Sequence, residues 1–135
     1  MKNKKVIDKY SQPIYVPQNL YICKNFSKAD LDKLFYVEDH KSILDTVSID
    51  EYQALTISGA FEVSTSNICI VILINYEECT DMQAEDIAGL CAHEAFHVAH
   101  RMLELCGLEL ASESCESYAF VTGWAAECMF KTMMK

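Results

Sequence analysis

The sequence has little glycine, little proline and no sign of division into parts. Its 135 residues include only four glycines and two prolines, and about half of all residues are hydrophobic. No internal repeat, low-complexity stretch or Pro/Gly/Ser-rich linker interrupts it. A chain of this length buries roughly two thirds of the surface that it exposes when unfolded. We therefore expect a single folded domain over residues 1–135 rather than a disordered chain.

Long hydrophobic runs are also missing. A membrane-spanning helix needs roughly 20 consecutive apolar residues, and no stretch approaches that length. Four lysines lie near the N-terminus, but polar residues follow them where a signal peptide needs an apolar run. These are Lys2, Lys4, Lys5 and Lys9. The pattern predicts a flexible basic N-terminus at residues 1–12 and a cytoplasmic protein that is not exported.

Basic residues are scarce in the chain as a whole. Eleven Lys and Arg stand against 20 Asp and Glu, which gives a formal net charge of −9. An acidic surface repels the phosphates of nucleic acids and the headgroups of anionic lipids. We therefore expect neither a nucleic-acid partner nor a membrane partner.

The seven cysteines lack the spacings that bind metals or form disulfide frameworks. No two of them form a C-x-x-C pair, and their number is odd. Most stand beside apolar or small residues, as reduced cysteines in protein interiors do. We interpret them as reduced thiols in a reducing compartment.

The N-terminal half is predicted to contain a strand and a short helix. Residues 14–23 look extended, with Pro17 suited to an edge or a bend. Ser27 can cap a short helix, with Asp30 at its third position. Residues 37–51 are acidic and weakly patterned, which indicates a loop with a helical turn.

Two paired strands are expected next. Residues 55–63 alternate between apolar and polar or small side chains, which is the pattern of a half-buried strand, and Gly59 suits a bulge. The apolar positions are Leu55, Ile57, Phe61 and Val63. Residues 64–67 fit a hairpin connection. Residues 68–74 are continuously apolar and rich in β-branched side chains, which predicts a central strand covered on both faces.

Two helices are expected in the C-terminal part. Thr80 and Gln83 predict a capping box at the start of a long helix, and Gly107 offers its C-terminal end. Ser112 can cap a second helix that continues past Trp124. The order of strand, short helix, two paired strands and two helices predicts an α+β fold.

The first long helix carries the sequence His93-Glu94-Ala95-Phe96-His97. A spacing of four places both imidazoles on one face of a helix, one turn apart, so that they can bind one zinc ion. Glu94 is turned about 100° from His93 around the helix, so it need not be a ligand. It is placed to act as general base on a zinc-bound water.

A catalytic zinc site of this kind needs a third protein ligand. His100 and Glu104 are poor candidates, because His100 stands about 10 Å from His93 along the helix axis and Glu104 still farther. His100 suits a flanking or substrate-contacting role. The second helix offers Glu113 and Glu116, three residues apart, and from geometry either could be the ligand.

The motif resembles that of the zincin metallopeptidases of the gluzincin branch, in which HExxH is followed on a later helix by a glutamate ligand. Here HEAFH at 93–97 is followed by Glu116 in ESYAF. The compact layout is similar to minimal zincin-like proteins carried by phages and prophages, over about residues 68–125. The resemblance implies a small, mostly antiparallel sheet packed on the HExxH helix. It favours Glu116 over Glu113 as the third ligand.

Two features of the resembling family are missing from this chain. Many gluzincins have an aspartate one turn after the ligand glutamate, where this chain has Phe120. Larger members also carry a second domain with a His or Tyr that stabilises the oxyanion, and too few residues follow Glu116 for such a domain. The residues that could take over this helping role are His100, Tyr118, Tyr76 and His40.

The resemblance implies a zinc-dependent peptidase with a peptide or protein substrate, in which Glu94 is the catalytic base. The alternating segment 55–63 is expected to pair with an extended peptide. The alternative is a non-catalytic zinc-stabilised structural or interaction module of the phage or prophage type.

Overall fold

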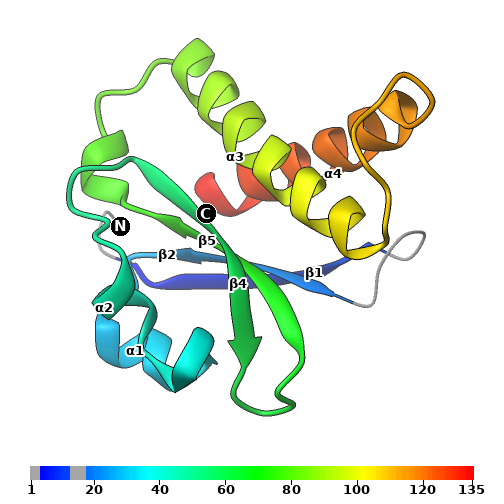
Figure 1. Ribbon diagram of the computed structural model, residues 1–135. Helices are drawn as coiled ribbons and strands as arrows, with labels where there is room; N and C mark the ends of the chain where they lie inside the picture. Colours follow the sequence, from blue (N-terminus) through cyan, green and yellow to red (C-terminus); the bar gives the residue numbers. More distant parts are fainter. Residues whose placement is uncertain (1–3, 13–17) are drawn as a thin grey trace.

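The computed structural model describes residues 4–12 and 18–135 and shows the expected α+β fold (Figure 1). Among these residues the strands are β1 (Val6–Ser11), β2 (Asn19–Lys24), β3 (Phe35–Tyr36), β4 (Ala54–Glu62) and β5 (Ile68–Ile74). The α-helices are α1 (Lys28–Asp32), α2 (Ile43–Thr46), α3 (Ala84–Leu105) and α4 (Cys115–Met133). The strands form one sheet in the order β1-β2-β5-β4-β3, which is antiparallel except for the parallel pair β2 and β5.

Strand β5 is the centre of the sheet and is covered on both faces, as its continuous apolar sequence predicts. Helices α3 and α4 lie on one face, and α1 and α2 lie on the other (Figure 1). Side chains of β5 alternate between two cores because successive residues of a strand point to opposite faces. Ile70, Ile72 and Ile74 pack in the core beneath α3 and α4. Cys69, Val71 and Leu73 pack in the core beside α1 and α2.

A bulge in β4 reverses the faces of the strand. Between Ile57 and Ala60, three steps along β4 span two steps along β5, so Gly59 lies in the predicted bulge. The extra residue inverts the alternation beyond it. Ala60 and Glu62 are therefore buried, and Val63, predicted to be on the apolar side, is half exposed. The predicted alternation holds before the bulge and is wrong after it.

The N-terminal segment is more ordered than the sequence suggested. Val6–Ser11 forms β1 and pairs antiparallel with all of β2. Residues 6–11 of the predicted flexible tail therefore form a strand. The segment Val6-Ile7-Asp8-Lys9-Tyr10 has no apolar alternation that would have revealed it. Strand β2 confirms the end of the extended segment 14–23, and Pro17 lies outside the described residues.

The helix starts agree only in part with the predicted caps. Ser27 and Asp30 form the expected capping box at α1. Helix α3 begins later than predicted, with the Asp86 carboxylate accepting from the backbone N–H of Gln83 at 2.9 Å, while the Thr80 hydroxyl donates to the Glu77 carbonyl oxygen. A polar side chain can bond locally to a turn as readily as to a helix start, which misplaces caps read from sequence.

The chain turns from α3 into α4 through a connection that begins at Gly107. Helix α3 ends beside this glycine, which has a φ of +77° that favours glycine. The N–H of Leu108 donates to the Leu103 carbonyl oxygen at 2.9 Å and closes the helix end. Helix α4 then begins at Cys115 rather than after Ser112, because the Ser114 hydroxyl bonds to the connecting turn at Ala111.

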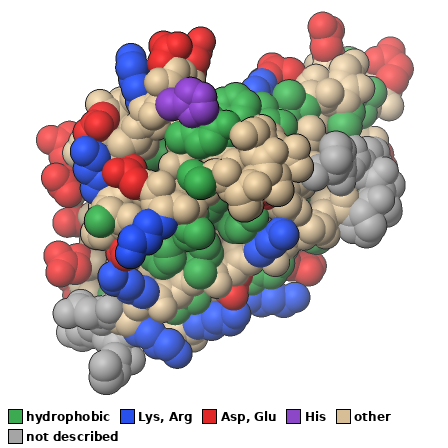
Figure 2. Space-filling view, turned by 90° about the horizontal axis from the view of Figure 1, so that it is seen from below, with side chains coloured by type: hydrophobic (Ala, Val, Ile, Leu, Met, Phe, Trp, Pro, Cys, Tyr) green, Lys and Arg blue, Asp and Glu red, His purple; other side chains and the backbone are tan. Residues whose placement is uncertain are grey.

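The surface is mixed in character. Seen from below, hydrophobic and Lys or Arg side chains are interspersed across the face, and many Asp and Glu side chains lie near its margins (Figure 2). Among the described residues, no helix has the length and apolar character needed to cross a membrane.

Candidate metal centre

The structure brings His93, Glu94 and His97 together in the middle of α3. One ligand atom from each lies within 4.8 Å of the others, close enough for a metal ion to be held. The two imidazole rings have centroids 5.0 Å apart and both are exposed, whereas Glu94 is buried. Two imidazoles and a carboxylate form a donor set that suits zinc among other divalent metals. The described residues therefore contain a candidate metal centre, as the motif predicts.

The carboxylate of Glu94 is fixed by contacts to two neighbours. Its Oε2 lies 3.6 Å from Nε2 of His93, and its Oε1 accepts a hydrogen bond from the hydroxyl of Thr56 at 3.1 Å. Thr56 lies on β4, beneath the motif. Only 5% of the Glu94 side chain is exposed, so the carboxylate is held on the floor of the site rather than extended into solvent.

A groove of about 530 Å³ runs between α3 and β4 over these residues. Its helix side is formed by His93, Glu94, His97, His100, Arg101 and Glu104, and its strand side includes Ala54, Leu55, Thr56 and Ser58. Strand β3 pairs with β4 only at Phe61 and Glu62, so the outer edge of residues 54–60 has no strand partner among the described residues. An unpaired strand edge beside a groove can accept an extended peptide by backbone hydrogen bonding.

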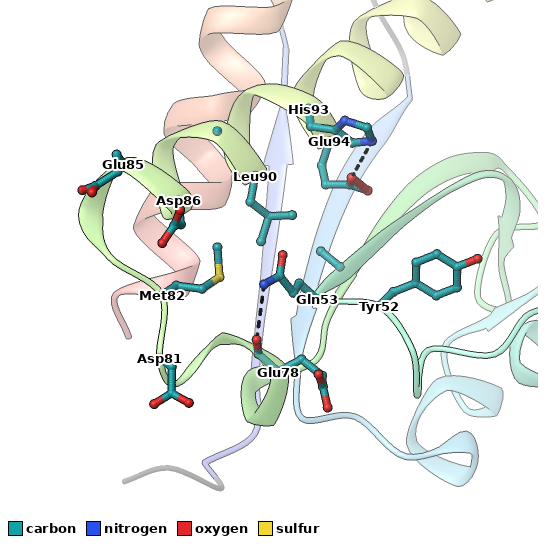
Figure 3. Close-up of a pocket in the computed structure, with 12 residues that line it drawn as sticks. Tyr52, Gln53, Glu78, Asp81, Met82, Glu85, Asp86, Leu90, His93 and Glu94 are labelled. Atoms are coloured by element: carbon teal, nitrogen blue, oxygen red, sulfur yellow. Dashed lines mark hydrogen bonds and ion pairs between the residues drawn. The ribbon is translucent and has the colours of Figure 1, made fainter.

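A second hollow of about 780 Å³ adjoins the groove and shares His93 and Glu94 with it. Figure 3 shows these two side chains extending from α3 on the side of Tyr52, and Leu90 and Met82 also line the hollow. Four carboxylates surround it, those of Glu78, Asp81, Glu85 and Asp86. The hollow is therefore acidic on its rim and apolar on part of its floor.

The two candidate third ligands lie apart from the cluster. Glu113 precedes α4, and Glu116 lies in its first turn; both are exposed. The buried face of α4 is set by Tyr118 and Val121, and Glu116 is turned about 200° from Tyr118 around the helix. The structure thus does not bring either carboxylate to the histidine pair. The assignment of the third ligand stays a prediction.

The accessory residues are divided between the groove and the interior. His100 lines the groove, as its position past His97 predicts. Tyr118 is buried, and its hydroxyl donates to the Leu108 carbonyl oxygen at 2.8 Å. Burial raises the pKa of the Tyr118 phenol, which keeps it a donor. Tyr118 therefore serves the α3–α4 connection in this arrangement.

The other two suggested helpers lie outside the groove. The ring of Tyr76 faces the ammonium group of Lys24, 5.0 Å from its centroid. The ring of His40 stacks on Tyr36 with centroids 4.4 Å apart. Neither residue lines the groove that holds the histidine pair.

Two groove residues escaped the sequence analysis. Thr56 was counted only as a polar position of an alternating strand, and Arg101 was not singled out. Arg101 stands one turn after His97, and its Nε donates to the Ser58 carbonyl oxygen at 2.8 Å. The signal in the sequence that could have identified Arg101 is a basic residue one helical turn after the motif. The contact of Thr56 depends on strand register, which no local pattern reveals.

Comparisons with known proteins add no relative: no protein family, curated protein or solved structure matches this chain.

Proposed function

We propose that the protein is a zinc-dependent peptidase of the gluzincin type. The observation that carries the proposal is the convergence of His93, Glu94 and His97 on one point beside the open edge of β4. A motif that arose by chance on a surface helix would not be expected to face both a groove and an unpaired strand. The proposal assigns metal binding to the two histidines and base catalysis to Glu94.

The residues present fit a catalytic zinc ion. The histidines supply neutral nitrogen donors from an exposed face, and one further protein ligand leaves a position for water. We assign that ligand to Glu116 on the family resemblance alone. Because Glu116 is on the outer side of α4, this assignment requires the first turn of α4 to rotate relative to α3.

A zinc ion held there would polarise the scissile carbonyl and lower the pKa of its water towards about 7. With the metal bound, Glu94 would accept a proton from the attacking water as the new C–O bond forms, and would give it to the nitrogen of the leaving amine as the C–N bond breaks. The contact with Thr56 keeps the carboxylate oriented towards the groove, where the substrate carbonyl would lie.

The substrate in this proposal is an extended peptide that pairs with β4. The backbone of residues 54–57 offers the unpaired donors and acceptors for this pairing. The acidic hollow next to His93 favours basic side chains at one end of the peptide through charge complementarity. A peptide library that includes Lys and Arg positions is therefore the appropriate screen.

The test compares wild-type protein with Glu94→Gln in that screen, after both are loaded with zinc. Glutamine keeps the size of the side chain but cannot act as a base. We expect cleavage by the wild type, a loss of at least about a hundredfold in the variant, and equal zinc content in both. Equal cleavage by the two proteins would contradict the role of Glu94.

A second function is a zinc-stabilised module without catalysis. The observation in its favour is that three of the four helpers suggested for the oxyanion are engaged outside the groove, namely Tyr118, Tyr76 and His40. In that case zinc raises the thermal stability of the protein, no library peptide is cleaved, and Glu94→Gln has no functional consequence.

A further inference from the structure

The strand beneath the motif carries a half-buried hydroxyl group. Thr56 lies on the face of β4 that is turned towards α3, opposite Ile72 in the sheet register. Its neighbour on that face, Ala54, belongs to the hydrophobic core beneath the helices, as does Ile72. A valine would fill the same volume and suits a strand as well as threonine does. Thr56 is half-buried where it lines the groove, and its hydroxyl has a partner there.

The partner of the Thr56 hydroxyl is Glu94. The Thr56 hydroxyl donates to Oε1 of the carboxylate at 3.1 Å, and lies at the longer distance of 3.4 Å from the Glu94 carbonyl oxygen. A carboxylate on a side chain that is 5% exposed needs such donors, because burial removes most of its water. A hydrogen bond to a charged group is also stronger and more directional than one between neutral groups.

The contact matters most when a metal is present. In the structure, Glu94 is held by Thr56 on one oxygen and by His93 at 3.6 Å on the other. A nitrogen of His93 that binds a metal ion can no longer donate to the carboxylate. Of the two contacts, only the one from Thr56 then remains to hold Glu94 in position.

We propose that Thr56 is a positioning residue, whose hydroxyl holds the Glu94 carboxylate turned towards the groove. The inference rests on the proposed peptidase function for its kinetic consequence but not for its geometry. Thr56 acts through Glu94 and does not contact the reacting atoms. Because it stands on the strand that would pair with substrate, it links the peptide-binding edge to the base.

The experiment compares Thr56→Val, which removes the hydroxyl, with Thr56→Ser, which keeps it. We expect kcat to fall at least about tenfold in the valine variant while KM and zinc affinity change by less than about twofold. The serine variant should recover kcat to within about threefold of the wild type. Thr122→Val, on α4 away from the groove, is the matched control and should behave as the wild type.

Crystal structures of the same variants decide the inference even if no peptide is cleaved. We expect the Glu94 carboxylate to leave its position in Thr56→Val and to keep it in Thr56→Ser. An unmoved carboxylate in Thr56→Val overturns the inference, and so does an unchanged kcat. Absence of cleavage by the wild type, with the carboxylate displaced in Thr56→Val, would sink the peptidase proposal and leave the positioning contact established.

Discussion

Nε of Arg101 donates to the carbonyl oxygen of Ser58 at 2.8 Å and so joins α3 to the bulge of β4. The same guanidinium binds Glu104 through Nη1, also at 2.8 Å. Since the bulge lies at one end of the groove, this contact fixes the spacing of the two walls there. The Arg101 side chain therefore holds the helix that carries the motif against the strand that faces it. Replacement of Arg101 tests this role.

Replacement of Arg101 by alanine should loosen this end of the groove. We expect the free energy of unfolding to fall by about 1 kcal/mol, the usual contribution of one hydrogen bond to a protein. Urea denaturation measures this, and amide hydrogen exchange should become faster in β4 than in β5. Lys33→Ala, at an exposed position, is the control. Equal stability of the two variants would show that Arg101 does not fix the bulge.

Glu62 should make stability depend on pH. Burial by itself raises the pKa of this carboxyl, but hydrogen bonds from Asn19, Thr65 and Tyr21 outweigh it and lower the pKa below its ordinary 4.5. A lowered folded-state pKa stabilises the protein above pH 4.5, and this contribution is lost as the pH falls through the folded-state value. Urea unfolding of wild type and Glu62→Gln from pH 7 to pH 3 should therefore converge at the acid end.

The control for this pH series is Glu51→Gln, which alters an exposed carboxylate. It should follow the wild type at every pH. If the difference between wild type and Glu62→Gln stays constant down to pH 3, the hydrogen-bonded carboxylate is not the source of the effect.

The thiols should divide into two reactivity classes. Burial raises the pKa of Cys23, Cys69 and Cys128 to about 12, whereas Cys106 and Cys115 are exposed. Thiolates are the reactive form, so a disulfide reagent should modify the two exposed residues first and the others only on unfolding. Serine at both exposed positions should remove the fast phase. A fast phase that persists would mean that a buried thiol becomes accessible.

The third metal ligand separates the family resemblance from the observed arrangement of α4. The resemblance predicts that Glu116→Ala lowers zinc affinity at least about tenfold, while Glu113→Ala leaves it unchanged. Competition with a zinc-binding dye measures both. Unchanged affinity in Glu116→Ala would show that α4 keeps its outer side turned away from the histidines, as in the structure.

The parts of the fold that follow from local pattern were predictable. The central strand at 68–74 followed from its unbroken apolar run, the hairpin from its turn residues, and the bulge from the glycine at position 59. The inverted faces after the bulge did not follow, because a single extra residue changes every later position. Strand β1 was missed because Lys9 and the three lysines that precede the strand suggested a solvated tail.

Of the candidate site, only the residues that are close together in the sequence were predictable. His93, Glu94 and His97 were identified because their spacing is local to one helix. Thr56 belongs to the site through the packing of β4 against α3, and the side of α4 that faces the histidines depends on how two helices pack. Both are long-range properties, which a single sequence does not determine.

The most direct test of the account is the zinc content of the purified protein, measured by elemental analysis without chelators. Wild type and His97→Ala are compared with His40→Ala, whose ring stacks on Tyr36 away from the groove. We predict about one zinc per chain in the wild type and in His40→Ala, and little in His97→Ala. No zinc in the wild type after incubation with excess metal, or equal zinc in all three proteins, would contradict the metal centre at His93 and His97.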